Sequence, residues 1–219
     1  MYEIIAGIYV CYLVFMVSSA VIQELWYSDE LPDIDKDRTD YPLVTIVIPT
    51  CDSRLDNIEL SIDYLIKNPY PRKEIIIADN SNDETFLQQL ELLVTKKKVE
   101  FYHKKDQKGF KAGILNYILP HVSGEYLIII DSDQILKQEA IYKLVQMIET
   151  DDQIAYVQGK FEIYNADTLI RKSNSILYAW YYELLSRAKD LRKSVLFNGT
   201  SAIFRKTVLE DIGGFSCLL

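Results

Sequence analysis

The sequence predicts an α/β fold in which helices cover both faces of a mostly parallel sheet. Short apolar runs alternate along the chain with longer segments whose apolar residues recur at helical spacing. The densest apolar run, residues 126–130, is typical of a strand that is buried on both faces. Strands that alternate with helices usually pair in parallel, which gives a doubly wound domain.

Two acids, Asp131 and Asp133, follow directly after this buried run. Side chains at positions i and i+2 of a strand point to the same face, so at a strand end both carboxylates can bind one divalent cation. Taken alone, Asp-Ser-Asp after a strand is also ordinary turn chemistry. The acid pair therefore leaves a metal site and a turn as alternatives.

Composition narrows the class of protein. The 219 residues are 49% apolar and 26% charged, which is enough for one sizeable core. The formal charge of −8 argues against nucleic acid as the main partner, because phosphate backbones bind basic surfaces. Cys11, Cys51 and Cys217 lie far apart and form no CxxC pair, so neither a zinc site nor a disulfide framework is indicated.

The N-terminal segment is apolar, and residues 4–22 contain no charged side chain. About 20 such residues suffice to cross a bilayer, and the first three residues lack the basic region of a signal peptide. We therefore expect a single-pass membrane anchor over residues 1–27. Lys36 and Arg38 follow it, so the positive-inside rule predicts a cytoplasmic main domain.

An acidic stretch over residues 28–40, with six acids and two bases, is predicted to be a solvated linker to the main domain at 41–219. Periodicity in that domain predicts strands over 43–48, 74–78, 99–102, 127–130 and 154–158, and helices over 55–66, 86–94, 114–119, 140–148 and 169–189. Ligands of such sheets bind at the carboxyl ends of strands, where Asp79, Asp131 and Asp133 lie.

Four stretches, taken together, resemble glycosyltransferase family 2, and in particular its membrane-anchored polysaccharide synthase branch, which includes cellulose, mannan and hyaluronan synthases. The resemblance covers residues 41–215. Its motifs are Ile75 to Thr85, Lys108 to Asn116, the Asp131-Ser132-Asp133 triplet after Gly124-Glu125, and Val157-Gln158 with Asn165, Phe197 to Thr200 and Gly213-Gly214-Phe215.

This resemblance implies a GT-A type nucleotide-binding fold and inverting transfer of a sugar from a UDP- or GDP-linked donor to the hydroxyl of a sugar or lipid acceptor. It implies Mg²⁺ or Mn²⁺ at Asp133, with help from Asp131, to neutralise the leaving diphosphate. Asp79 is expected to accept hydrogen bonds from the nucleobase or ribose. Lys111, in a glycine-flanked loop, is expected to approach the nucleotide or diphosphate.

Two departures from the family pattern stand out. Asn80 occupies a position where many relatives carry a second Asp. In addition, the family's Thr-Glu-Asp-like motif, which supplies the general base, and its Gln-x-x-Arg-Trp motif normally follow Gly213-Gly214-Phe215. We therefore expect the base beyond Leu219 and a domain that is incomplete at its C-terminus.

Two other functions remain open at this point. One is a catalytically incomplete family member that binds nucleotide sugar or acts as a membrane-associated partner. The other is a phosphatase-like enzyme with Asp131 as nucleophile, which would leave the motifs at 108–113 and 197–200 without a role.

Overall fold

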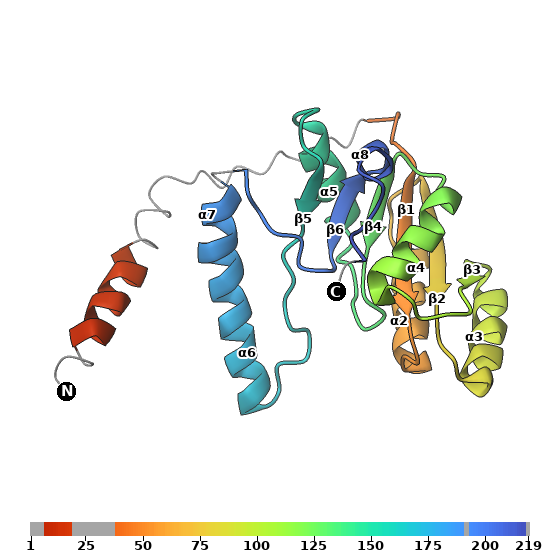
Figure 1. Cartoon of the computed structure of the whole chain (residues 1–219), viewed down its shortest axis with the longest axis horizontal. Coiled ribbons are helices and arrows are strands. Elements are labelled where there is room, and N and C mark those ends of the chain that lie inside the picture. Colours follow the sequence, from red (N-terminus) through yellow and green to blue (C-terminus); the bar gives the residue numbers. More distant parts are fainter. Residues whose placement is uncertain (1–6, 19–37, 191–192, 218–219) are drawn as a thin grey trace. The chain divides into compact units, whose positions relative to one another are not determined.

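The computed structural model of the chain describes residues 7–18, 38–190 and 193–217 (Figure 1). The chain divides into two compact units. One unit comprises residues 31–159 and 197–219, and the other comprises residues 1–30 and 160–196. The first unit contains the sheet and the sequence-predicted site residues.

The described residues form one six-stranded sheet with the strand order β3-β2-β1-β4-β6-β5. Its strands are β1 (Val44–Thr50), β2 (Lys73–Asp79), β3 (Glu100–His103), β4 (Tyr126–Ile129), β5 (Tyr156–Gln158) and β6 (Ala202–Arg205). Strand β1 pairs in parallel with β2 and β4, and β2 pairs in parallel with β3. Because β6 is antiparallel to both β4 and β5, it is the reversed strand of a mostly parallel sheet. The mostly parallel sheet is as predicted, whereas β6 is not among the predicted strands.

The helices lie close to the predicted ranges. They are α2 (Leu55–Lys67), α3 (Glu84–Lys97), α4 (Phe110–Ile118), the 3₁₀ turn η1 (Leu119–His121), α5 (Ala140–Glu149), α6 (Leu169–Trp180), the π-helical η2 (Tyr181–Ser186), α7 (Arg187–Asp190) and α8 (Lys206–Asp211). Helix α3 begins where the Asp83 carboxylate accepts hydrogen bonds from the amides of Thr85 and Phe86.

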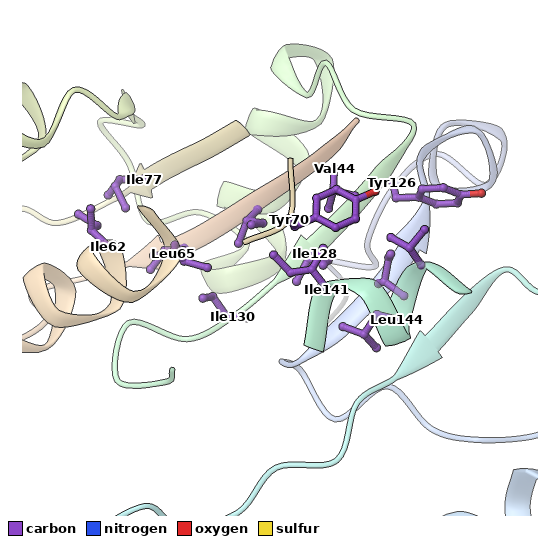
Figure 2. Close-up of a cluster of buried hydrophobic side chains, with 14 of the residues drawn as sticks. Val44, Ile62, Leu65, Tyr70, Ile77, Tyr126, Ile128, Ile130, Ile141 and Leu144 are labelled. Carbon is purple, nitrogen blue, oxygen red and sulfur yellow. The ribbon is translucent and has the colours of Figure 1, made fainter. Parts of the chain in front are cut away.

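Two hydrophobic clusters lie on opposite faces of the sheet. Along β2, Ile77 belongs to the first cluster, whereas Ile76 and Ala78 belong to the second, as the two-residue period of a strand requires. Helices α2 and α5 pack into the first cluster (Figure 2), as does α3, and α4 and α8 pack into the second. The domain is therefore covered by helices on both faces, which confirms the predicted α/β class.

The end of the predicted linker contacts the domain. Residues 28–37 lie outside the described residues, but the guanidinium of Arg38 forms an ion pair with Glu149 on α5 and lies 5.5 Å from the centre of the Tyr41 ring. Tyr41 in turn packs edge-on against Tyr70 and Tyr142. The domain therefore begins before the predicted boundary at residue 41.

The predicted membrane anchor is wrong. Among the described residues, no helix combines the length and the apolar character that a bilayer crossing requires. The described part of the N-terminal segment, residues 7–18, is helical. The remaining anchor residues, 1–6 and 19–27, lie outside the described part of the chain. The predicted cytoplasmic placement loses its basis with the anchor.

In the second unit, the predicted helix over residues 169–189 is continuous through α6, η2 and α7. Thr168 caps its start, with the hydroxyl accepting from the Arg171 amide at 3.3 Å. The Phe161 ring packs against the rings of Tyr178 and Tyr182 at 4.9 and 5.1 Å. Helix α6 itself buries no side chain, so the aromatic residues do not make it a core helix.

We predict that Ile128→Ala in β4 destabilises the fold by about 2–5 kcal/mol, because the side chain is completely buried and the substitution leaves a cavity. Ile66→Ala on α2 is the matched control, since this side chain is 46% exposed, and it should change the free energy of unfolding by less than about 0.5 kcal/mol. Urea denaturation of the full chain measures both values. Equal effects of the two substitutions would contradict the placement of β4 at the centre of the core.

Candidate functional site

A cavity of about 570 Å³ opens at the carboxyl ends of β1 and β4. Its walls come from the segment after β1, the residue after β2, the start of α4 and the segment after β4. The lining residues are Pro49, Thr50, Cys51, Asp52, Ser53, Arg54, Asn57, Asn80, Gln107, Phe110, Lys111, Ile114, Asp131, Ser132 and Asp133. This is the edge at which ligands bind in parallel α/β sheets.

The structure brings Asp131, Asp133 and Lys111 together in this cavity. The Lys111 ammonium forms an ion pair with the Asp131 carboxylate, and their side chains are 35% and 40% exposed. Asp133 is exposed. Such a partly exposed ion pair adds little to stability, because solvent screens it. It does hold the lysine ammonium beside the two acids.

Lys111 lies in the first turn of α4 and not in a flexible loop. The preceding Gly109 has φ +80°, and the amide of Gly113 donates to the Gly109 carbonyl at 2.8 Å. A Cβ at Gly113 would overlap the carbonyl oxygen of Lys108, so the chain approaches itself too closely for any other residue. The glycines that flank Lys111 therefore build a tight helix start that holds the lysine over the cavity.

Asp79 is completely buried, and the cavity is lined by its neighbour Asn80 instead. The Asp79 carboxylate accepts hydrogen bonds from the Thr50 hydroxyl at 2.8 Å and from the amide and hydroxyl of Ser81 at 2.9 and 2.7 Å. Nδ1 of His103 lies 3.0 Å from Oδ2 of the same Asp79 carboxylate. These protein partners compensate the buried carboxylate and fix the backbone on both sides of Asn80.

His103 was not predicted to be part of this region, because it is isolated in the sequence. It ends β3, which pairs with β2 so that His103 stands directly opposite Asp79. The only sequence signal for this contact is the position of both residues at the ends of consecutive predicted strands.

Cys51 lines the cavity, and Nε2 of Gln107 donates to its sulfur at 3.2 Å. Burial raises the pKa of the Cys51 thiol, and the carboxylates of Asp52 and Asp79 raise it further. The thiol is therefore protonated at neutral pH and is a weak nucleophile.

The motif at residues 197–200 reaches the acid pair through β6. Because β6 runs antiparallel to β4, Ala202 stands opposite Ile129, and the segment before β6 lies beside the end of β4. The Thr200 hydroxyl accepts a hydrogen bond from the Asp131 amide at 3.0 Å. Gln134, which sequence reasoning did not single out, joins the same contacts through its side-chain oxygen.

The Gly213-Gly214-Phe215 motif contacts the stretch at 108–116. The side chain of Asn116 donates to the Phe215 carbonyl at 2.8 Å and accepts from the Phe215 amide at 2.7 Å. Gly214 has φ +89°, and a Cβ there would overlap the Asn116 side chain. Two motifs that are about a hundred residues apart in sequence are thus joined by one asparagine.

The carboxylates in the cavity suit a cation that is bound jointly by the protein and a ligand, and not a metal site made of protein side chains alone. Among the described residues, no three His, Cys, Asp or Glu side chains gather as a metal site. Asp131 and Asp133 nevertheless offer two carboxylates to one cavity. Mg²⁺ is commonly held by one or two carboxylates together with substrate phosphates, so the two acids suit a cation that a diphosphate helps to bind.

A known family matches the part of the chain that carries these motifs. The family model for Glycosyl transferase family 2 matches residues 45–213. The chain belongs to this family. The match contains every strand of the described sheet except the first residue of β1, Val44, and it contains all residues that line the cavity.

Polysaccharide synthases are among the proteins that are similar to this chain. The chain is 25% identical over 221 residues to cellulose synthase 1 catalytic subunit [UDP-forming] of Komagataeibacter xylinus, covering 97% of this chain and 29% of that protein. It is 25% identical over 193 residues to poly-β-1,6-N-acetyl-D-glucosamine synthase of Staphylococcus aureus, covering 87% of this chain and 46% of that protein. The chain thus spans less than half the length of these relatives.

Solved structures share the fold. The mannosyltransferase PcManGT of Pyrobaculum calidifontis, solved in complex with GDP-Man and Mn²⁺, matches with a TM-score of 0.73 at 21% identity, over 99% of this chain and 58% of that one. TarS of S. aureus matches with a TM-score of 0.52 at 20% identity, over 77% of this chain and 29% of that one. These likenesses confirm a GT-A-like α/β fold.

We predict that Asp79→Ala destabilises this family 2 domain by about 3 kcal/mol, because Thr50, Ser81 and His103 lose a buried partner. Asp56→Ala is the control, since this side chain is 88% exposed and lies 3.8 Å from Arg54. Chemical denaturation of the full chain reports both values. A neutral Asp79→Ala substitution would show that the carboxylate does not organise this end of the sheet.

Proposed function

We propose that the domain predicted over residues 41–219, to which the structure adds Arg38, is the donor-binding domain of an inverting, metal-dependent glycosyltransferase that builds a polysaccharide or glycolipid. The observation that carries this proposal is the cavity in which two carboxylates and a lysine meet at the carboxyl edge of the sheet. The relatives support the substrate class, since they include a UDP-forming cellulose synthase and a poly-β-1,6-N-acetyl-D-glucosamine synthase.

The donor is a nucleotide diphosphate sugar, linked to UDP or GDP. Solved proteins with the same fold were obtained with GDP-Man and Mn²⁺ and with UDP-GlcNAc. In this chain, Asp133 and Asp131 would hold Mg²⁺ or Mn²⁺ together with the diphosphate, and the cation would offset the charge that develops on the leaving group. Lys111 forms an ion pair with Asp131 in the free chain. When the diphosphate arrives, the lysine would leave Asp131 and bind a phosphate oxygen.

The nucleoside is assigned to the wall that carries Asn80. An amide both donates and accepts hydrogen bonds, so Asn80 suits the edge of a base or the ribose hydroxyls. A nucleotide contact by Asp79 stays a prediction, and Asp79 also supports Asn80 through the adjacent backbone. In the transfer, the acceptor oxygen bonds to the anomeric carbon from the face opposite the diphosphate. The anomeric C–O bond to the diphosphate breaks and the acceptor proton passes to a base.

We predict that Asp133→Asn weakens Mn²⁺-dependent binding of UDP or GDP by at least about tenfold, because a carboxylate ligand of the cation is replaced by a neutral amide. Glu91→Gln on α3 is the control, since it removes an exposed carboxylate outside the cavity. Isothermal titration calorimetry of the full chain, with Mn²⁺ and with EDTA, measures the difference. The proposal fails if neither nucleotide binds the wild-type chain when Mn²⁺ is present.

Lys111→Gln is predicted to act in opposite directions on two measurements. Without nucleotide it removes the counter-ion of Asp131, so Mn²⁺ should bind more tightly; with nucleotide it removes a cation from the diphosphate, so UDP or GDP should bind about two- to fivefold more weakly. Lys96→Gln on α3, where the side chain is 74% exposed, is the control. A change of the same sign in both titrations would contradict the exchange of Lys111 between Asp131 and phosphate.

A further assay separates transfer from binding alone. Release of UDP or GDP from a nucleotide sugar in the presence of an acceptor, followed by chromatography, is expected for an active transferase. Tight donor binding without release or product would favour the alternative of a family member that binds nucleotide sugar without turning it over.

A further inference from the structure

We propose that Gln134 and Thr200 are positioning residues, which hold the loop of Asp131 and Asp133 in the conformation that receives the cation. This inference rests on the proposed function of the cavity. Neither residue lines the cavity, so both act through the backbone of the acid loop.

The first half of the argument is the set of hydrogen bonds around one side-chain oxygen. Oε1 of Gln134 accepts from the hydroxyls of Thr200 and Ser201 at 2.6 and 3.0 Å, and from the Asp131 amide at 3.3 Å. The Thr200 hydroxyl accepts from the same amide at 3.0 Å. The first residue of the acid pair is therefore tied to two side chains, one of which comes from a segment about seventy residues later.

The acid loop is also held from helix α2. The hydroxyl of Ser61, which is 1% exposed, donates to the carbonyl oxygens of Ser132 and Gln134 at 3.0 and 2.7 Å. The backbone amide of Gln134 donates to the backbone carbonyl of Asp131 at 3.0 Å and closes the turn. The backbone from residue 131 to 134 is thus attached both to α2 and to the segment before β6.

The partner segment is itself fixed. Nε2 of Gln158 donates to the Thr200 carbonyl at 2.9 Å, and its Oε1 accepts from the Asn198 amide at 3.0 Å. The Ser201 amide donates to the carbonyl of Ile129, the last residue of β4, at 2.7 Å. Thr200 and Ser201 are buried, so water cannot replace a lost partner, and a satisfied network of this kind is rigid.

A rigid loop matters here because the two acids repel each other without a cation, and Lys111 pairs with only one of them. Metal ligands must stand within a few tenths of an ångström of their ideal distances. If the loop already has its metal-binding conformation, no part of the binding free energy is lost to a rearrangement of the loop. Loss of partners behind the ligands typically weakens metal binding by about 10- to 100-fold.

The test compares variants of the full chain. Gln134→Met and Thr200→Val remove the network at nearly constant size, whereas Gln134→Glu keeps the acceptor oxygen and Gln89→Met changes an exposed glutamine on α3. Electron paramagnetic resonance titration gives the Mn²⁺ affinity in the presence of UDP or GDP. Hydrogen–deuterium exchange gives the protection of residues 131–134 without any ligand.

We expect Gln134→Met and Thr200→Val each to weaken Mn²⁺ binding about tenfold or more and to speed exchange at residues 131–134. The double variant should lose less than the product of the two, because both act in one network. Gln134→Glu and Gln89→Met should keep wild-type exchange, and a melting temperature shows that each variant is folded. If Thr200→Val does not fold, Thr200→Ser takes its place. Because it retains the hydroxyl, it should keep the wild-type Mn²⁺ affinity and the wild-type exchange.

Unchanged Mn²⁺ affinity and unchanged exchange in folded Gln134→Met overturn the inference. If the wild-type chain binds neither nucleotide nor Mn²⁺, the proposed function falls. The exchange rates then decide by themselves whether Gln134 and Thr200 hold the loop.

Discussion

The parallel pairing of β1 with both β2 and β4 is the constraint on which the site depends. In this register Thr50 stands opposite Asp79, and Val47 stands opposite Ile129, so three strands end at one edge of the sheet. A slip of one residue would turn every side chain of a strand to the other face and expose its buried apolar residues. The cores on both faces therefore fix the positions of the polar strand ends.

The reversed strand β6 adds what a purely parallel sheet lacks. Its first residue, Ala202, pairs with the last residue of β4, so the polar segment before β6 meets the segment after β4. The acids thus receive neutral hydrogen-bond partners from a distant part of the chain. An all-parallel neighbour of β4 would present its own carboxyl end there, and with it a different loop.

The sequence predicts most of the sheet, and three of the predicted site residues lie together in one cavity. Apolar periods locate the strands and helices, and the carboxyl-edge rule places Asp131 and Asp133 at one edge of the sheet. Lys111, which the family resemblance implied, lines the same cavity. These features depend on local pattern and on a general property of parallel sheets. The same rule also places Asp79 at that edge, but it cannot tell whether the side chain or its neighbour faces the cavity.

What the sequence could not predict depends on contacts between distant residues. Two of the partners of Asp79 come from β1 and β3, and Gln134 gains its role only because β6 inserts beside β4. Arg38 belongs to the domain because Glu149 is near, although its neighbours in sequence are acidic.

The two groups of polar residues at this edge differ in charge and in burial. Thr50, Ser81, Thr200, Ser201 and Ser61 are neutral and buried, and every described hydroxyl among them has a partner. Asp131, Asp133 and Lys111 are charged and keep contact with water. Buried neutral networks add rigidity without the desolvation cost of an ion, whereas a charge that must meet a ligand is cheapest to keep hydrated until the ligand arrives. The fold therefore supplies the position of the acids, and the counter-charge that they need is left to the lysine and to the ligand.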